Sequence, residues 1–281
     1  MENIGVIGLG RMGSAMAQRL AAQGQTVAGW TRSGRHVDGI PSTPDLSTLV
    51  SRSDTLILSL FDDTAVADTL DQLLTSDLTS KQIIETSTVV PAILQDRITA
   101  IEANGATAVD APISGGPELV LSGGCGIFIG GTDDAATRAQ ATLTHVTDRI
   151  FHVGPLGAGL VMKTINNSML QAYFAGLGDM MPLAKRAGLT LETAIRILSG
   201  GPAGVPMVAD RIPRILGEDT SVGFAIEAIL KDTDVFKRVA AAYGLDAPTL
   251  DLFAQRVHAA VDAGLGEADP AAMITHAYQN G

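Results

Sequence analysis

The feature that most constrains the fold is a regular alternation of short apolar runs and helix-like stretches, which stops near residue 154. The apolar runs are predicted strands, at residues 3–8, 25–30, 54–61, 81–87, 106–112, 125–131 and 148–154. Helix-like segments lie between several of them, at residues 12–23, 63–75, 90–103 and 132–144. Strands rich in β-branched residues that alternate with helices indicate parallel βαβ units with helices on both faces of the sheet.

The remaining sequence shows only helical patterns, at residues 159–187, 191–199, 225–243, 249–263 and 270–279. Pro182 is expected to kink or interrupt the first of these helices. The pattern therefore predicts an α/β fold with two domains. A Rossmann-type dinucleotide-binding domain covers residues 1–157, and an all-helical domain for substrate binding and oligomerisation covers residues 158–281. A long interdomain helix joins them.

Composition excludes several classes of protein. A formal charge of −11 argues against nucleic acid as a partner, because phosphate binding requires a basic surface. The single cysteine, Cys125, permits no intrachain disulfide and fits a reducing compartment. No signal peptide or membrane-spanning run is apparent, so we expect a cytoplasmic protein. The five histidines lack metal-ligand spacing, and we therefore predict no metal site.

A glycine cluster follows the first predicted strand directly. It reads Gly8-Leu9-Gly10-Arg11-Met12-Gly13, a G-x-G-x-x-G pattern at the start of a helix. The first glycine permits the tight turn, the second lets the backbone approach a pyrophosphate, and the third lets helix and strand pack closely. The strand before the motif and the helix and second strand after it supply the context that the pattern requires. The cluster predicts a bound dinucleotide.

The end of the second strand indicates which dinucleotide is preferred. An NAD site places Asp or Glu there to hold the ribose 2′-hydroxyl, whereas this sequence has Thr31-Arg32-Ser33 and no acid before Asp38. Arg32 can pair with a 2′-phosphate, and the two hydroxyls add donors. We therefore expect NADP(H) to be preferred over NAD(H).

Two further stretches carry candidate chemistry. Residues 110–116, DAPISGG, place the Ser114 hydroxyl and the backbone of Gly115 and Gly116 at a strand end, an arrangement able to receive a carboxylate. Residues 159–170, GLVMKTINNSML, contain Lys163 as the only charged residue. Taken alone, Lys163 fits either a lysine that extends to solvent from a buried helix or an amine kept inside for chemistry.

Together these motifs resemble the β-hydroxyacid dehydrogenase family, which includes 3-hydroxyisobutyrate dehydrogenases, tartronate semialdehyde reductases and glyoxylate/succinic semialdehyde reductases. The matching stretches occur in order along nearly the whole chain: GLGRMGSAMA (8–17), TSTVVP (86–91), DAPISGG (110–116), GAGLVMKTINN (157–167) and FAIEAILKD (224–232). The resemblance implies a homodimer or homotetramer. It also implies oxidation of a small carboxylate-bearing hydroxy acid, or reduction of its semialdehyde.

The resemblance also implies roles for individual residues. Lys163 is the catalytic lysine, Ser114, Gly115 and Gly116 bind the substrate carboxylate, and Asn167 holds a substrate oxygen. Further cofactor contacts are implied at Leu60, Phe61, Thr88, Phe224, Lys231 and Asp232. The sequence departs from the family at Arg19, where asparagine is common, and at Leu119 and Val120, where a Gly-Ala pair is common. The bulkier side chains of Leu119 and Val120 beside the carboxylate site mean that the identity of the substrate does not follow from the resemblance.

We therefore predict an NADP(H)-preferring oxidoreductase that interconverts a small 3-hydroxy acid and its semialdehyde, with Lys163 as general acid and base. One alternative is an imine reductase-like enzyme on the same fold, which the lysine disfavours. Another is a non-catalytic NADP(H)-sensing protein. A full 6-phosphogluconate dehydrogenase, whose NAD-binding domain is similar, is disfavoured because its C-terminal domain is usually much larger.

Overall fold

The structure is a computed structural model that describes residues 2–281. The chain divides into two compact units that meet in the sequence between Asn166 and Asn167. The boundary predicted after residue 157 follows the change from strands to helices and stays a prediction. Within residues 2–281, no helix is both long and apolar enough to cross a membrane.

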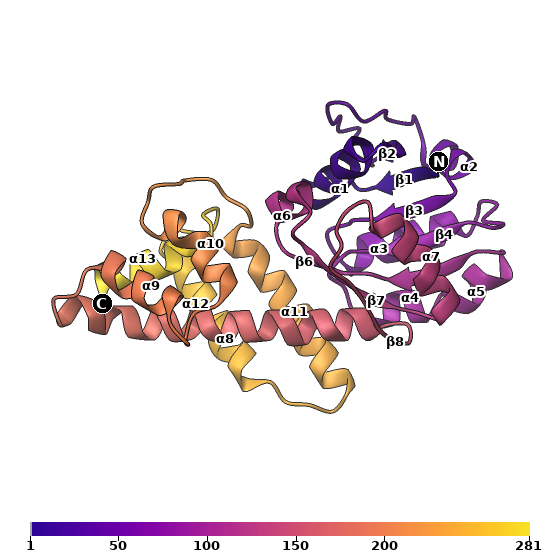
Figure 1. Cartoon of the computed structure of the whole chain (residues 1–281). Coiled ribbons are helices and arrows are strands. Elements are labelled where there is room, and N and C mark those ends of the chain that lie inside the picture. The colour runs from indigo at the N-terminus through magenta and orange to yellow at the C-terminus, as the bar shows by residue number, and fades with distance from the viewer. Residues whose placement is uncertain (1) are drawn as a thin grey trace. The chain divides into compact units, whose positions relative to one another are not determined.

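The first unit is built on a sheet that residues 2–166 form from eight strands. The strands are β1 (Asn3–Ile7), β2 (Thr26–Trp30), β3 (Thr55–Leu58), β4 (Gln82–Glu85), β5 (Thr107–Asp110), β6 (Ile113–Ser114), β7 (Gly126–Gly130) and β8 (Ile150–Gly154). Their order is β2-β1-β3-β4-β5-β7-β6, with β8 also paired to β7, and β1 to β5 run parallel (Figure 1). All seven predicted strands are present, and β6 is additional.

The sheet is not parallel throughout, because β7 runs antiparallel to both β5 and β6. A parallel crossover needs a dozen or more residues, usually with a helix that spans the sheet. Between β5 and β7 the chain has only the short β6 and a six-residue helix, α6 (Pro117–Ser122). The chain therefore enters β7 at the same edge of the sheet at which it leaves β5, and β7 runs back antiparallel to β5.

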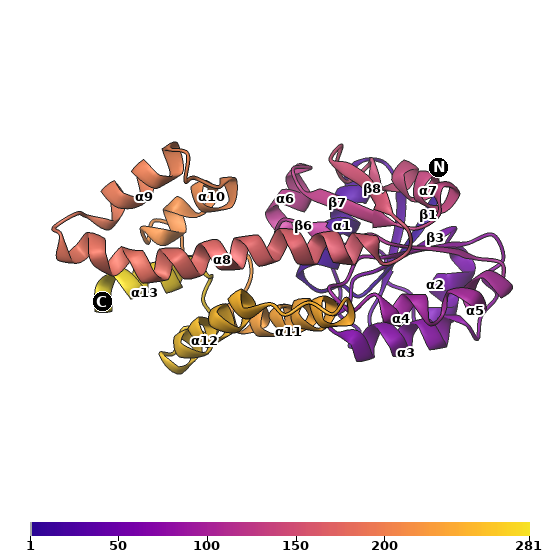
Figure 2. The same ribbon diagram turned by 90° about the horizontal axis from the view of Figure 1, so that it is seen from below.

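Helices cover both faces of this sheet, as predicted. They are α1 (Arg11–Ala22), α2 (Leu46–Arg52), α3 (Asp63–Leu73), α4 (Ala92–Gln95), α5 (Ile98–Ala103), α6 and α7 (Asp133–Leu143). The two groups of helices lie on opposite sides of the sheet (Figure 2). Buried residues of α1, α6 and α7 join one core, and those of α2 to α5 join another. In β3, Ile57 faces the first core while Leu56 and Leu58 face the second, which explains the continuous apolar strand.

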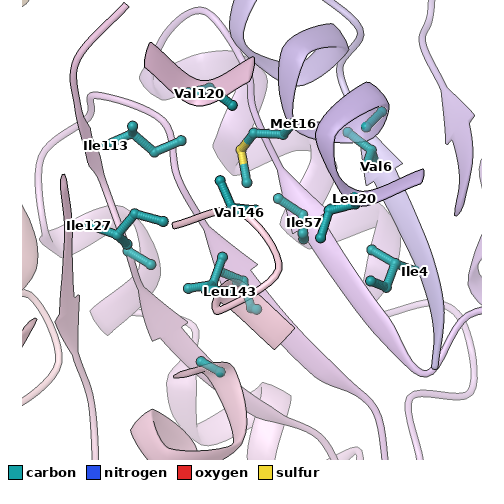
Figure 3. Packing of buried hydrophobic residues seen from close by; sticks show 14 of the residues in the cluster. Ile4, Val6, Met16, Leu20, Ile57, Ile113, Val120, Ile127, Leu143 and Val146 are labelled. Atoms are coloured by element: carbon teal, nitrogen blue, oxygen red, sulfur yellow. The ribbon is translucent and has the colours of Figure 1, made fainter. Parts of the chain in front are cut away.

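The first core forms where α1 packs onto the centre of the sheet. Met16 and Leu20 of α1 lie against Val6 and Ile57 (Figure 3). Cys125 lies in the same core with none of its surface exposed. Burial raises the pKa of this thiol, and it is not suited to act as a nucleophile.

The second unit is helical. The long helix α8 (Ala158–Arg186) begins in the first unit and ends in the second, and it continues through Pro182 without interruption. It is followed by α9 (Leu191–Gly200), α10 (Pro206–Ile215), α11 (Ile226–Ala242), α12 (Pro248–Asp262) and α13 (Ala271–Asn280). Buried residues of α8 to α13 share one core. Of these helices, only α10 has no counterpart among the predicted helical stretches.

Candidate active site

The glycine cluster forms the turn between β1 and α1 that the sequence predicted. Gly8 has a φ of +93°, and a side chain there would overlap the carbonyl of Ser59. A Cβ at Gly13 would overlap the carbonyl of Gly8, whereas a Cβ at Gly10 would meet nothing within 4 Å. Gly10 also precedes α1 with no side-chain cap. An open backbone beside an uncapped helix N-terminus is the geometry that receives a pyrophosphate.

The neighbouring cofactor candidates lie at the carboxyl ends of β1, β2, β3 and β4. Leu9 is buried in the core, so only its backbone could contact a ligand. Arg11 is exposed and Met12 is half-buried. Leu60 lies beside Gly8 and its amide donates to the Ser87 hydroxyl at 2.9 Å. The remaining positions on these loops differ in exposure: Phe61 is 66% exposed, and Thr88 is half-buried.

The segment after β2 places the candidates for a 2′-phosphate together. The Thr31 and Ser33 hydroxyls lie 3.3 Å apart, and a turn closes from the Gly34 amide to the Thr31 carbonyl at 3.0 Å. The Arg32 side chain between them is exposed. Within residues 2–281 no carboxylate pairs with it, so its charge is available to an anionic ligand.

The catalytic candidate, Lys163, lies on α8 and is only 8% exposed. Its Nζ donates to the carbonyl oxygen of Ile113 at 2.5 Å. One residue after Ile113, the Ser114 hydroxyl accepts a hydrogen bond from Asn166 Nδ2 at 3.1 Å. The lysine is therefore held inside, against the strand end that carries the Ser-Gly-Gly motif, and does not extend to solvent.

The loop after Ser114 adopts a conformation that favours glycine. Gly115 has a φ of +132°, and Gly116 begins α6. Leu119 lies against Gly115, where a Cβ would come within 3.1 Å of it. Val120, by contrast, is fully buried in the core of the first unit. Of the two bulky departures in this segment, only Leu119 borders the candidate carboxylate site.

A buried carboxylate fixes the start of the helix that carries Lys163. Asp110 has no exposed surface, and its two carboxylate oxygens accept from the amides of Gly157 at 2.6 Å and Leu160 at 2.8 Å. A side chain at Gly130 or Gly159 would overlap this carboxylate. Asp110 belongs to the DAPISGG motif, but no role was predicted for it. The glycines around the start of α8 are the sequence signal that could have indicated this role.

Burial raises the pKa of Asp110 to about 6, although its backbone hydrogen bonds act in the opposite direction. The folded protein therefore retains this proton at a pH where the unfolded chain has already lost it. The contribution of Asp110 to stability is consequently largest at low pH and declines as the pH rises through about 6.

The other departure, Arg19, has a structural explanation. Its guanidinium donates to the carbonyl of Val146 at 3.3 Å and to that of Leu121, near the end of α6, at 3.5 Å. A positive charge near a helix C-terminus is favourable. Arg19 therefore ties α1 to α6, the helix that follows the Ser-Gly-Gly motif.

The remaining candidates lie in the second unit. Asn167, Phe224 and Asp232 line a cavity of about 130 Å³ inside it. Lys231 pairs with Asp232 at 2.7 Å. Asp269, buried before α13, accepts from the Gly223 amide at 3.3 Å and so holds the backbone next to Phe224. Among residues 2–281, no cluster of three or more His, Cys, Asp or Glu side chains could hold a metal.

Five parallel strands with an open, uncapped glycine turn after the first of them are the arrangement of a dinucleotide-binding protein. A sequence profile for the NAD-binding domain of 6-phosphogluconate dehydrogenase matches residues 3–154, and one for the NAD-binding region of NADP-dependent 3-hydroxyisobutyrate dehydrogenase matches residues 157–277. The chain belongs to the β-hydroxyacid dehydrogenase family and is an oxidoreductase of that type, as predicted.

One curated relative and two solved structures are similar to the chain over nearly its whole length. The mitochondrial 3-hydroxyisobutyrate dehydrogenase of Drosophila melanogaster is 28% identical over 95% of this chain and 87% of its own length. The structure of the Mycobacterium tuberculosis 3-hydroxyisobutyrate dehydrogenase with L-serine is 24% identical, with a TM-score of 0.86 over 98% of this chain and 99% of that one. An imine reductase from a Pseudomonas species shares the fold with a TM-score of 0.63, at 22% identity over 97% of this chain and 98% of that one.

The buried carboxylate yields a prediction about pH. Replacing Asp110 by Asn should remove the proton linkage, so the unfolding free energy of the wild type relative to Asp110→Asn should fall by about 2 kcal/mol between pH 4 and pH 7. Denaturant titrations followed by the fluorescence of Trp30, the only tryptophan, report on the first unit.

The control is Asp54→Asn. Hydrogen bonds from Asn3 lower the pKa of Asp54, so above about pH 5 this carboxylate is ionised in both the folded and the unfolded state. The difference in unfolding free energy between the wild type and Asp54→Asn should therefore stay constant from pH 5 to pH 7. If the difference in unfolding free energy between the wild type and Asp110→Asn did not change from pH 4 to pH 7, the raised pKa of Asp110 would be wrong.

Proposed function

We propose that this enzyme interconverts a small 3-hydroxy acid and its semialdehyde, with preference for NADP(H) and with Lys163 as general acid and base. The observation that carries the proposal is the position of Lys163. Its amine is buried and lies 2.5 Å from the carbonyl of Ile113, directly before the Ser-Gly-Gly motif. A buried amine beside an anion-binding loop is suited to act on a carbonyl group of a bound carboxylic acid.

The carboxylate of the substrate would be held by the loop that begins at Ser114. Because the Ser114 oxygen accepts from Asn166, its own hydrogen can be donated to a carboxylate oxygen. The backbone of Gly115 and Gly116 follows directly and would add N–H donors. The three residues therefore fit the role that the family resemblance gives them.

Lys163 would then complete the reaction at the substrate oxygen. An ammonium has three N–H donors, and Ile113 orients one of them. In the reductive direction the amine stabilises the developing alkoxide and donates the proton; in the oxidative direction the neutral amine accepts the hydroxyl proton. Asn167 lies one helical turn further along α8 and would hold the same oxygen. The bound nicotinamide supplies or accepts the hydride.

This role predicts the outcome of Lys163→Met, which keeps the volume and removes the amine. The kcat should fall by at least about a hundredfold, with NADPH affinity little changed, because general acid–base catalysis contributes about 10²–10⁴ in rate. Steady-state kinetics and NADPH titration by fluorescence measure the two quantities.

The matched control is Lys81→Met. Lys81 also donates to a backbone carbonyl, that of Ser53 at 2.7 Å, but it lies before β4 at the opposite edge of the parallel strands. Its replacement should leave kcat within about twofold of the wild type. Normal turnover by Lys163→Met would refute the mechanism.

The preference for NADP(H) rests on the segment after β2. An exposed arginine between two hydroxyl side chains can bind a 2′-phosphate, and the first acid after it is Asp38. A charge-assisted contact of this kind contributes about 1.5–3 kcal/mol. Phe224, Lys231 and Asp232 remain proposals for the nicotinamide end of the cofactor, by family resemblance.

Arg32→Ala should therefore lower kcat/KM for NADPH by about tenfold to a hundredfold and change that for NADH little. Arg35→Ala is the control, because Arg35 is equally exposed but lies beyond the Thr31–Gly34 turn. Comparable kcat/KM for NADPH and NADH in the wild type would show that the preference does not exist.

Two other functions are separable by experiment. An imine reductase would reduce a cyclic imine such as 1-pyrroline with NADPH faster than any semialdehyde, and it would have no need of a buried lysine beside the carboxylate loop. A non-catalytic sensor would bind NADPH tightly and turn over neither substrate. A panel of glyoxylate, succinic semialdehyde, tartronate semialdehyde and methylmalonate semialdehyde distinguishes these cases.

We further propose that the protein is a cytoplasmic homodimer or homotetramer. Within the second unit, Met169, Met180 and Leu183 of α8 are each more than half exposed, and exposed apolar residues on one helix are typical of an interface between subunits. The mass in solution, measured by light scattering, should be two or four times 29.0 kDa.

A further inference from the structure

The loops that follow β3 and β4 are joined to each other by the Ser87 side chain. Its hydroxyl accepts a hydrogen bond from the Leu60 amide at 2.9 Å, which links the segment after β4 to the loop after β3. Ser87 is only 4% exposed, and its own amide donates to the carboxylate of Glu85 at 2.7 Å. Glu85 has no exposed surface. The Ser87 backbone is therefore anchored in the interior of the first unit, and its hydroxyl is presented to Leu60 from a fixed position.

A second hydrogen bond joins the same two loops. The Val90 amide donates at 3.2 Å to the carboxylate of Asp63, which lies in the first turn of α3. The two hydrogen bonds lie on either side of Phe61 in one loop and of Thr88 in the other, and both residues are candidate cofactor contacts. Two connections prevent the rotation about a single contact that one connection would allow. The two loops therefore form one surface.

The place of these loops in the sheet relates them to one half of the dinucleotide. Arg32, the candidate for the 2′-phosphate, follows β2, and the glycine turn follows β1. β3 and β4 come next in the sheet, on the side of β1 away from β2. Because neighbouring strands lie about 4.8 Å apart, the end of β4 is about 10 Å beyond that of β1. With the adenosine half at β2 and the pyrophosphate at β1, the nicotinamide half extends over the loops after β3 and β4.

We propose that Ser87 is a positioning residue for the nicotinamide half of the cofactor, and that with Asp63 it holds the loops after β3 and β4 as one surface. The inference rests on the proposed function, which uses a nicotinamide dinucleotide as hydride carrier. Ser87 acts through the backbone of Leu60 and does not need to touch the cofactor itself. A surface that is ordered before the cofactor arrives binds it more tightly, because less conformational freedom is lost on binding.

Two ligands separate the halves of the cofactor. NADP⁺ contains both halves, whereas adenosine 2′,5′-bisphosphate contains only the adenosine half with its 2′-phosphate. Ser87→Ala removes the acceptor of the Leu60 amide, so the Kd for NADP⁺ should rise by about tenfold, while that for the bisphosphate stays within about twofold of the wild type. Isothermal titration calorimetry measures both values. A merely structural role for Ser87 would weaken the two ligands equally.

Two further variants serve as references for Ser87→Ala. Ser87→Thr keeps a hydroxyl and should restore the Kd for NADP⁺ to within about threefold of the wild type. Ser53→Ala is the matched control, because Ser53 is 3% exposed and its hydroxyl donates to the Leu49 carbonyl at 2.8 Å. Ser53 lies before β3, at the opposite edge of the parallel strands. Its replacement removes a buried hydroxyl of the same kind and should leave both Kd values within about twofold.

The second hydrogen bond is tested at Asp63. Asp63→Ala removes the acceptor of the Val90 amide and should raise the Kd for NADP⁺ by at least about threefold, with little change for the bisphosphate. Asp63→Asn keeps an acceptor oxygen and should bind NADP⁺ as the wild type does. If Ser87→Ala does not fold, the comparison of Asp63→Ala with Asp63→Asn decides in the same way.

Equal changes in the Kd values of the two ligands on Ser87→Ala, or no change in either, would overturn the inference. If the wild type binds NAD⁺ but not NADP⁺, the cofactor preference is wrong, and the same comparison is made with NAD⁺ and ADP. If it binds neither dinucleotide, the proposed function and this inference both fail. If it binds NADP⁺ but turns over no hydroxy acid, only the proposed reaction fails, because the Kd values still decide the role of Ser87.

Discussion

The position of the candidate catalytic amine depends on one buried interaction, between the Asp110 carboxylate and the backbone amides at the start of α8. Asp110 ends the last of the parallel strands, and the two amides begin the helix that carries Lys163 about one turn later. A carboxylate at a helix N-terminus is favourable because the first amides have no partner within the helix. The sheet thus sets the axial position of α8, and α8 sets that of Lys163.

Much of the fold follows from local patterns in the sequence. Strands buried on both faces are continuous apolar runs, and the G-x-G-x-x-G turn identifies the first strand and helix. The direction of β7 could not be predicted this way, because an apolar run does not indicate whether its strand is parallel or antiparallel to its neighbour. The direction depends on the short helix α6, which is too short to carry the chain back across the sheet. The sequence after Gly116 has no helical apolar pattern long enough to reveal this helix.

Which residues form the candidate site could be predicted from the sequence, but which of them contact each other could not. Lys163 and Ser114 were found from motifs, and the structure brings both to the end of one strand. Ser114 accepts a hydrogen bond from Asn166, to which no role was assigned, whereas the family resemblance gives the neighbouring Asn167 a substrate oxygen. Neighbouring side chains on a helix point about 100° apart, so the two asparagines serve different partners.

The antiparallel return at β7 has a consequence for how this enzyme can diversify. Ile113 and Ser114 pair with Ile127 and Gly126, so the segment between them is a closed loop anchored at both ends by backbone hydrogen bonds. The side chains beyond Gly116, Leu119 included, can therefore vary while the anchored strand keeps the carbonyl of Ile113 in place to hold Lys163. The surroundings of the candidate carboxylate loop can thus evolve without moving the candidate catalytic lysine.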